Sequence, residues 1–290
     1  MSASTANLGV STFILASPFT DHDYGVFEKV RHWGYDHVEV CIEDPGAITP
    51  SALSAAAAAA DLEVLICGAF GPERDVSHED ARARQSGMDY LRHCIDVAAA
   101  VGSPLVSGPM YATTGQARLL EPPERRAQWD RAVQSLGEVA AYARAAEVSL
   151  AIEPLNRFET DLVNTVDQGL ALCADIGADN VGLMLDTFHM NIEEKSLPAA
   201  IRRAGDKVFN FQAAENDRGI PGTGHTDWDG VFAALRDIGY RGTIVVESFL
   251  PTVKEIARAV SLWRPVAPSM DALAEYGAAF VLKATKAARE

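Results

Sequence analysis

Residues 148–186 read VSLAIEPLNRFETDLVNTVDQGLALCADIGADNVGLMLD, and this stretch contains one complete repeat of the pattern on which the predicted fold is based. It begins and ends with short apolar runs, at 148–154 and 180–186, and a segment with helical periodicity lies between them at 164–176. An apolar strand, a helix and a second apolar strand make the βαβ unit of a parallel sheet that is covered on both faces. The stretch therefore predicts an α/β protein.

The same unit repeats along the whole chain. The expected strands are 8–13, 37–42, 62–68, 104–109, 148–154, 180–186, 207–213 and 242–248. The expected helices are 22–33, 50–60, 78–101, 123–145, 164–176, 197–204 and 228–238, followed by a C-terminal helical region. The helix at 50–60 has a clear start, because Thr49 is a candidate N-cap and Pro50 takes the first helical position. Eight units predict a closed (β/α)8 TIM barrel, with residues 1–290 as a single domain.

A doubly wound open sheet is the competing architecture. The first βα turn has no GxGxxG fingerprint, and neither a GxxxxGK[ST] loop nor a GxSxG elbow occurs in the sequence. No linker, low-complexity segment or repeat of 20 to 50 residues interrupts the pattern. These observations favour the barrel over the open sheet, a solenoid or two domains.

Charge and composition limit the partners. The formal net charge of -15 would repel phosphate backbones and anionic lipids, so we expect no nucleic acid and no membrane partner. No apolar run approaches the roughly 20 residues that span a bilayer, and the first ten residues lack a signal-peptide pattern, which predicts a cytoplasmic protein. The cysteines form no CxxC pair and are expected to be reduced core thiols; they are Cys41, Cys67, Cys94 and Cys173.

Polar residues stand at the ends of the last four expected strands, where a barrel of this kind builds its active site. They are Glu153, Asp186, Gln212 and Glu247. Carboxylates at the ends of apolar strands are costly to bury alone, and a hard divalent cation compensates them directly. Oxygen ligands favour Mn²⁺ or Mg²⁺ over zinc. For any single acid, a helix cap or an ion pair with arginine is the alternative.

The loops after these strands add further candidates. They are Arg157 and Glu159, then His189, then Glu215, Asn216, Arg218 and His225. His189 lies three residues past Asp186, which favours a functional role. For Glu159 and Arg218, the residues alone are as consistent with a solvated surface charge as with a substrate contact.

Four segments with these residues resemble the ketose 3-epimerase family of xylose-isomerase-like barrels, which includes D-tagatose, D-allulose and L-ribulose 3-epimerases. The segments are IEPLNRFET (152–160), LMLDTFHMN (183–191), ENDRGIPGTGHTDW (215–228) and GTIVVESF (242–249). They look like that family's signatures of strands five to eight in the right order and spacing.

The resemblance implies residue roles. Glu153, Asp186 and Glu247 would be metal ligands, and Glu153 and Glu247 would also be the acid/base pair. Gln212 stands where the family usually has a metal-binding histidine, and its amide oxygen is a weaker ligand. The metal would be Mn²⁺ or Mg²⁺, with Co²⁺ as a further option. Substrate would be held by Glu159, His189 and Arg218. A homo-oligomer, either a dimer or a tetramer, is also implied.

These roles predict epimerisation of a free ketose at C3 through an enediolate, with two opposed bases. Alternatives within the same chemistry are an aldose-ketose or hydroxypyruvate-type isomerase and an inosose dehydratase. A non-catalytic sugar-binding barrel is an alternative of another class, whereas the charge of -15 disfavours a DNA-repair endonuclease. Candidates for contacts with the remaining hydroxyls are Phe13, Gly68, Met110, Tyr111 and Phe249.

Overall fold

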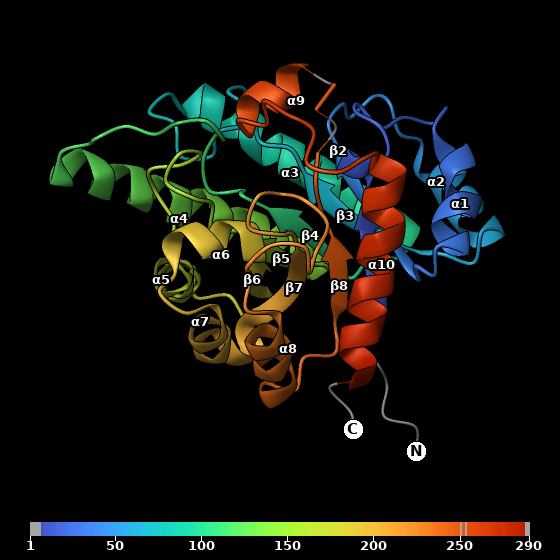
Figure 1. Cartoon of the computed structure of the whole chain (residues 1–290). Helices are drawn as coiled ribbons and strands as arrows, with labels where there is room; N and C mark the ends of the chain where they lie inside the picture. The colour runs from blue at the N-terminus through green and yellow to red at the C-terminus, as the bar shows by residue number, and fades with distance from the viewer. Residues whose placement is uncertain (1–6, 250, 253, 288–290) are drawn as a thin grey trace.

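The computed structural model describes residues 7–249, 251–252 and 254–287, which form a closed ring of parallel strands (Figure 1). Each strand pairs with the next, and the first pairs with the last. The strands are β1 (Asn7–Ser11), β2 (His37–Ile42), β3 (Glu63–Gly68), β4 (Leu105–Gly108), β5 (Ser149–Ile152), β6 (Val181–Asp186), β7 (Val208–Ala213) and β8 (Thr243–Val246). The predicted (β/α)8 barrel is confirmed. The open sheet is wrong, because β1 pairs with β8 and the sheet therefore has no free edge strand.

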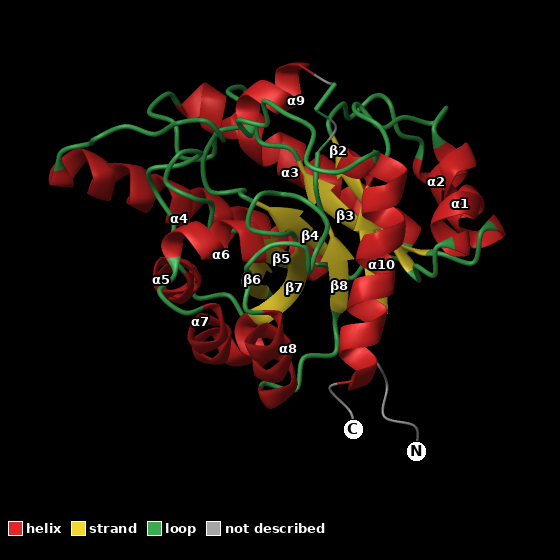
Figure 2. Cartoon of the chain, viewed as in Figure 1, coloured by secondary structure: helices red, strands yellow, loops and turns green. Residues whose placement is uncertain are grey.

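Helices surround the ring on the outside (Figure 2). They are α1 (Phe27–His32), α2 (Pro50–Ala59), α3 (Ala81–Val101), α4 (Pro122–Ala145), α5 (Val166–Ile176), α6 (Thr187–Glu193), α7 (Leu197–Ala204), α8 (Trp228–Asp237), α9 (Lys254–Ala259) and α10 (Met270–Ala287). Among the described residues, no helix is long and apolar enough to cross a membrane. The four cysteines are free and buried, as predicted.

Three local expectations need correction. The helix expected at 22–33 is a 3-10 turn at Tyr24–Val26 followed by the short α1. Thr49 lies at the N-cap of α2, but its side chain caps no helix amide; its backbone N–H donates to Asp21 Oδ1 at 2.8 Å. The stretch after Asp186 was expected to be a loop and is α6, because the Asp186 carboxylate caps it by accepting from the Phe188 N–H at 2.6 Å.

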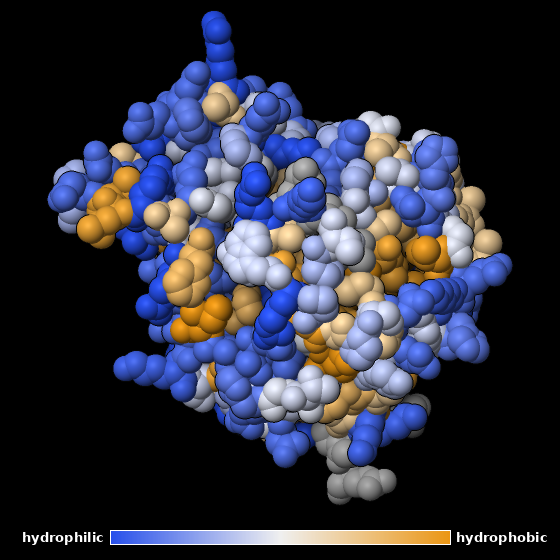
Figure 3. All heavy atoms as spheres, turned by 45° about the horizontal axis from the view of Figure 1, so that its top comes forward, coloured by the Kyte–Doolittle hydropathy of each residue, from blue (hydrophilic) through white to orange (hydrophobic). Residues whose placement is uncertain are grey.

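The barrel interior changes from apolar to polar along the strands. Leu65, Leu105 and Val245 form a small apolar cluster apart from the main core, which fits three inward-facing side chains. Two residues further along the same strands, the next positions with this orientation hold Cys67, Ser107 and Glu247. The strand ends therefore carry polar groups at the mouth, above an apolar floor. Toward that end, the outer face is largely hydrophilic with scattered hydrophobic residues (Figure 3).

The loop between β7 and α8 is held by one carboxylate. Glu215 is fully buried and accepts from Thr226 Oγ1 at 2.6 Å, Trp228 Nε1 at 2.9 Å and Gly222 N at 2.7 Å. Burial raises its pKa, but these hydrogen bonds outweigh burial and lower the pKa to about 2. The Glu215 carbonyl also accepts from the Arg218 N–H at 2.9 Å, so this loop fixes the backbone that carries Arg218.

Gly182 in β6 is so closely surrounded that a substitution there tests the packing of the barrel. A Cβ there would come within 2.6 Å of the Phe209 ring and 2.7 Å of the Lys207 carbonyl oxygen. We expect Gly182→Ala to lower the free energy of unfolding in urea by about 1–3 kcal/mol. Gly137→Ala in α4 is the control, since nothing lies within 4 Å and alanine favours a helix by roughly 0.5–1 kcal/mol. A Gly182→Ala protein as stable as wild type would contradict this packing.

Glu215 predicts a stability that depends on pH. Its folded pKa lies below the unfolded one, so its contribution is present above about pH 4.5 and is lost as pH falls toward 2. We expect Glu215→Gln to cost about 2 kcal/mol at pH 7, measured by urea unfolding, and the cost to shrink below pH 4.5. Glu138→Gln on the exposed side of α4 should change stability by less than about 0.5 kcal/mol. A cost that stays constant down to pH 3 would argue against an ionised Glu215.

Candidate active site

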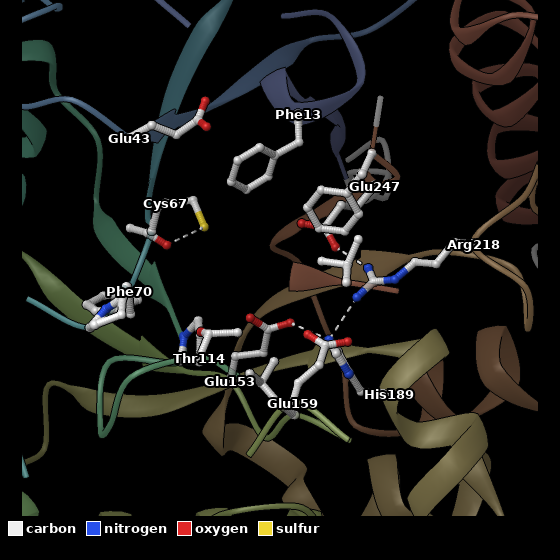
Figure 4. A pocket seen from close by; sticks show the side chains of 18 residues that line it. Phe13, Glu43, Cys67, Phe70, Thr114, Glu153, Glu159, His189, Arg218 and Glu247 are labelled. Atoms are coloured by element: carbon white, nitrogen blue, oxygen red, sulfur yellow. Dashed lines mark hydrogen bonds and ion pairs between the residues drawn. The ribbon is translucent and has the colours of Figure 1, made fainter. Parts of the chain in front are cut away.

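A cavity of about 310 Å³ lies at the C-terminal ends of the strands. Five of the seven predicted site residues line it, namely Glu153, Glu159, His189, Arg218 and Glu247 (Figure 4). Asp186 and Gln212 are buried and reach this group through hydrogen bonds to Arg218 and Glu247. The structure therefore brings together all seven residues, which come from the last four strands and the loops and helix that follow them.

Arg218 joins two of the strand ends. Its Nη1 donates to Asp186 Oδ2 at 3.0 Å and to Glu247 Oε2 at 2.6 Å. Burial alone would lower its pKa, but Asp186, Glu247 and the other carboxylates raise it, so the guanidinium stays charged. Arg218 is therefore buried at the cavity and is not the solvated surface charge that the sequence left open.

The backbone and two aromatic rings hold this arginine in place. Arg218 has a φ of +66°, which is unusual for a residue with a side chain, and its carbonyl accepts from Ser248 Oγ at 2.6 Å. The guanidinium lies between the rings of Phe188 and Phe249, at 4.2 and 4.8 Å from their centroids. These contacts fix the direction in which the charge points.

His189 lies on α6 and links the two sides of the cavity. Its Nδ1 is 3.0 Å from the backbone N of Asn156, and its Nε2 is 3.0 Å from Arg218 Nη2 and 3.5 Å from Glu153 Oε1. Burial, and then Arg218, hold the pKa of His189 well below its usual range, so the ring is neutral. Because Nδ1 accepts from the Asn156 N–H, the one ring proton of the neutral imidazole is on Nε2. This N–H faces Glu153 Oε1, whereas Arg218 Nη2 is itself a donor and cannot accept it. Asn156 Nδ2 also donates to Glu159 Oε1 at 2.8 Å, which ties Glu159 to this network.

Gln212 is held by two carboxylates. Its Nε2 donates to Glu39 Oε2 at 2.7 Å and to Glu247 Oε1 at 3.0 Å. Its Oε1 is buried and has no hydrogen-bond partner among the described residues. A buried acceptor without a partner is costly, so this oxygen is a candidate for binding a cation or substrate.

The electrostatics of the cluster fit a divalent cation. Burial and neighbouring carboxylates raise the pKa values of Glu153 and Glu247, and Arg218 opposes both shifts. Among the described residues, Arg218 is the only lysine or arginine whose side chain is buried. The buried carboxyl groups around it belong to Glu39, Glu153, Glu159, Asp186 and Glu247. One guanidinium cannot neutralise so many carboxylates, and a hard cation would bind the carboxylate oxygens and the free Gln212 oxygen.

The His189 ring lies close to two of the candidate metal ligands. One oxygen each of Glu153 and Asp186 and a ring nitrogen of His189 lie within 4.8 Å of one another. Glu247 and Gln212 adjoin this set through the hydrogen bonds already described. The family resemblance implies that His189 holds substrate, and its position also places it at the edge of the candidate metal site.

Other residues named from the sequence fall inside or outside the cavity. Phe13, Gly68 and Phe249 line it, whereas Met110 and Tyr111 are buried elsewhere. The remaining loop candidates are structural or lie at the surface. Arg157 is exposed and pairs with Glu193, Glu215 holds its loop, Asn216 accepts from the His225 backbone, and His225 is exposed.

Several residues of the site were missed in the sequence, among them Glu39, Asn156 and Cys67. Glu39 carried a signal, because it is a charged residue in the middle of the apolar strand HVEVCI. Asn156 and Cys67 had no such signal, since one lies in a loop and the other resembles a core residue. Their roles depend on contacts between segments that are distant in the chain.

The chain is similar to known proteins in both sequence and fold. The chain matches the family described as Xylose isomerase-like TIM barrel over residues 27–266. It is 33% identical to an L-ribulose 3-epimerase from Mesorhizobium japonicum, across 95% of this chain and 93% of that protein. It is 32% identical to a D-psicose 3-epimerase from Agrobacterium fabrum, across 84% of this chain and 85% of the other.

A solved structure of an L-ribulose 3-epimerase superposes with a TM-score of 0.92 at 33% identity, covering 98% of this chain and 96% of that one. Fold, length and sequence therefore agree over nearly the whole chain. The chain belongs to the xylose isomerase-like TIM barrel family and, within it, to the group of isomerases that contains the ketose 3-epimerases.

Proposed function

We propose that this protein epimerises a free ketose at C3, with Glu153 and Glu247 as the acid/base pair. One observation carries the proposal: the two glutamates reach a single cavity from β5 and β8, which are not neighbours in the ring. Two carboxyl groups from separated strands are suited to approach a substrate from different sides. The relatives named L-ribulose and D-psicose 3-epimerase support the same reaction.

The chemistry needs one proton acceptor and one proton donor. The proton on C3 is acidic because it lies next to the C2 carbonyl, and its removal leaves an enediolate. One glutamate takes this proton as a carboxylate, and the other, as a carboxylic acid, returns a proton to the opposite face. The raised pKa values of both side chains make each a better proton acceptor than an exposed glutamate.

A divalent cation is the second part of the proposal. Glu153, Asp186, Gln212 and Glu247 would hold it through oxygen atoms, which favours Mn²⁺ or Mg²⁺, with Co²⁺ as a further option. When bound, such an ion would draw electron density from the substrate carbonyl and so make the C3 proton more acidic. It would also balance the excess negative charge of the buried carboxylates.

Neighbouring donors would stabilise charge on the substrate oxygens. Arg218 Nε is buried and has no hydrogen-bond partner among the described residues, and His189 has one ring N–H to donate. Both side chains line the cavity, where they would hydrogen-bond oxygen as its negative charge grows. Glu159 lines the same wall and would accept from a substrate hydroxyl.

The lining favours an unphosphorylated sugar. Of the residues described around the cavity, Arg218 is the one cation, and two carboxylates already engage it. Phe13, Phe70 and Phe249 make much of the remaining wall apolar. A phosphate group would need further cations or a cluster of backbone N–H groups, and a neutral ketose does not.

The paired glutamates predict a defined loss in each single variant. Glu153→Gln and Glu247→Gln should each lower epimerisation by at least about 10²-fold, because one face of C3 can no longer exchange its proton. The measurement is formation of the C3 epimer from a ketose in D₂O, with deuterium at C3 and the metal content of each variant determined in parallel.

Glu43→Gln is the matched control. Glu43 lines the same cavity away from Glu153 and Arg218, and it binds Ser17 Oγ at 2.6 Å (Figure 4). This variant should keep proton exchange at C3. If Glu153→Gln or Glu247→Gln retains near-normal epimerisation with metal bound, the two-base assignment is wrong.

A further inference from the structure

Glu39 is a charged residue in the interior of the barrel. It lies in the middle of β2, is fully buried and does not line the active-site cavity. Its Oε1 accepts from Asn210 Nδ2 at 2.6 Å and from Ser107 Oγ at 3.3 Å, and its Oε2 accepts from Gln212 Nε2 at 2.7 Å. All three partners can donate, so they surround the carboxylate as an acceptor. The proposed reaction assigns no role to this group.

Glu39 also decides which way the Gln212 amide faces. The Gln212 NH₂ group lies between oxygens of Glu39 and Glu247. The reversed amide would place its oxygen against two carboxylates, which repel it, so the network determines the orientation. The Gln212 Oε1 is consequently the polar atom of this side chain that is left without a partner among the described residues.

We propose that Glu39 is a positioning residue that holds Gln212 with its side-chain oxygen available to the cation. This inference rests on the proposed function, because it assumes the metal site. Glu247 alone would be a poor anchor for the amide, since it is itself a candidate ligand. Glu39 is not one of the proposed ligands; it lies in a separate buried group with Cys41 and Cys67, and it comes from β2, on a different part of the ring from the candidate ligands. The oxygen of Gln212 thereby completes a donor set made of oxygen atoms.

Glu39→Gln tests the inference with little change in size. The new amide keeps one acceptor oxygen, which the two donors Asn210 and Ser107 favour on their side. Its NH₂ group would then face the Gln212 NH₂ group, and the Gln212 amide would lose its orientation. We expect the Kd for Mn²⁺, measured without substrate by titration calorimetry and by electron paramagnetic resonance of free Mn²⁺, to rise about 10–100-fold. Circular dichroism and thermal unfolding check that the variant is folded. Glu39→Asp, which withdraws the carboxylate by one methylene, should weaken binding too and serves if Glu39→Gln does not fold.

Two further variants separate positioning from a general structural effect. Ser107→Ala removes a hydrogen bond to Glu39 without touching Gln212, and it should leave the Kd within about threefold of wild type. Gln212→Ala removes the candidate ligand directly, so adding Glu39→Gln to it should change the Kd little further.

The outcomes are distinct. An unchanged Kd for Mn²⁺ in folded Glu39→Gln overturns the inference. The inference is also overturned if Glu39→Gln raises the Kd by the same factor in the Gln212→Ala background as in wild type, because Glu39 would then act through another group. Wild-type protein that binds no Mn²⁺ would overturn the proposed metal site together with this inference.

Discussion

The structure depends on burying several carboxylates close together at one end of a barrel. Glu153, Asp186 and Glu247 come from three strands, and a single guanidinium, that of Arg218, lies among them. Unpaired carboxylates at this depth would protonate or destabilise the fold. The aromatic rings of Phe188 and Phe249 and the loop held by Glu215 fix the position of this guanidinium, and a cation at the candidate site would balance the remaining charge. The same concentration supplies the proton-transferring groups of the proposed reaction.

The barrel and the convergence of its strand ends could be predicted from the sequence. Each of the last four apolar runs has a polar residue at its end, and in a parallel ring all strand ends of this kind lie on one side. This reasoning placed Glu153 and Glu247 at one mouth, where the structure has them. Their catalytic and metal-binding roles stay predictions, because proximity and burial do not show which proton moves or which ion binds.

The supporting contacts could not be predicted, because they depend on tertiary structure. No pattern in TFHMN indicated a helix at α6. This helix follows β6 directly, because Asp186 both ends the strand and caps the helix. The packing of Arg218 between Phe188 and Phe249 joins residues from three segments. Glu39 contacts Gln212 from 173 positions away in the chain. Periodicity describes one element at a time and carries no information about such partners.

We propose that this chain is a divalent-metal ketose 3-epimerase. The most direct test incubates the purified protein with Mn²⁺ and a panel of free pentuloses and hexuloses, with products identified by NMR. We expect C3 epimers of at least one ketose, and loss of activity with a chelator that Mn²⁺ restores. Formation of an aldose or a dehydrated product, or no turnover by protein that holds one equivalent of metal, would contradict it.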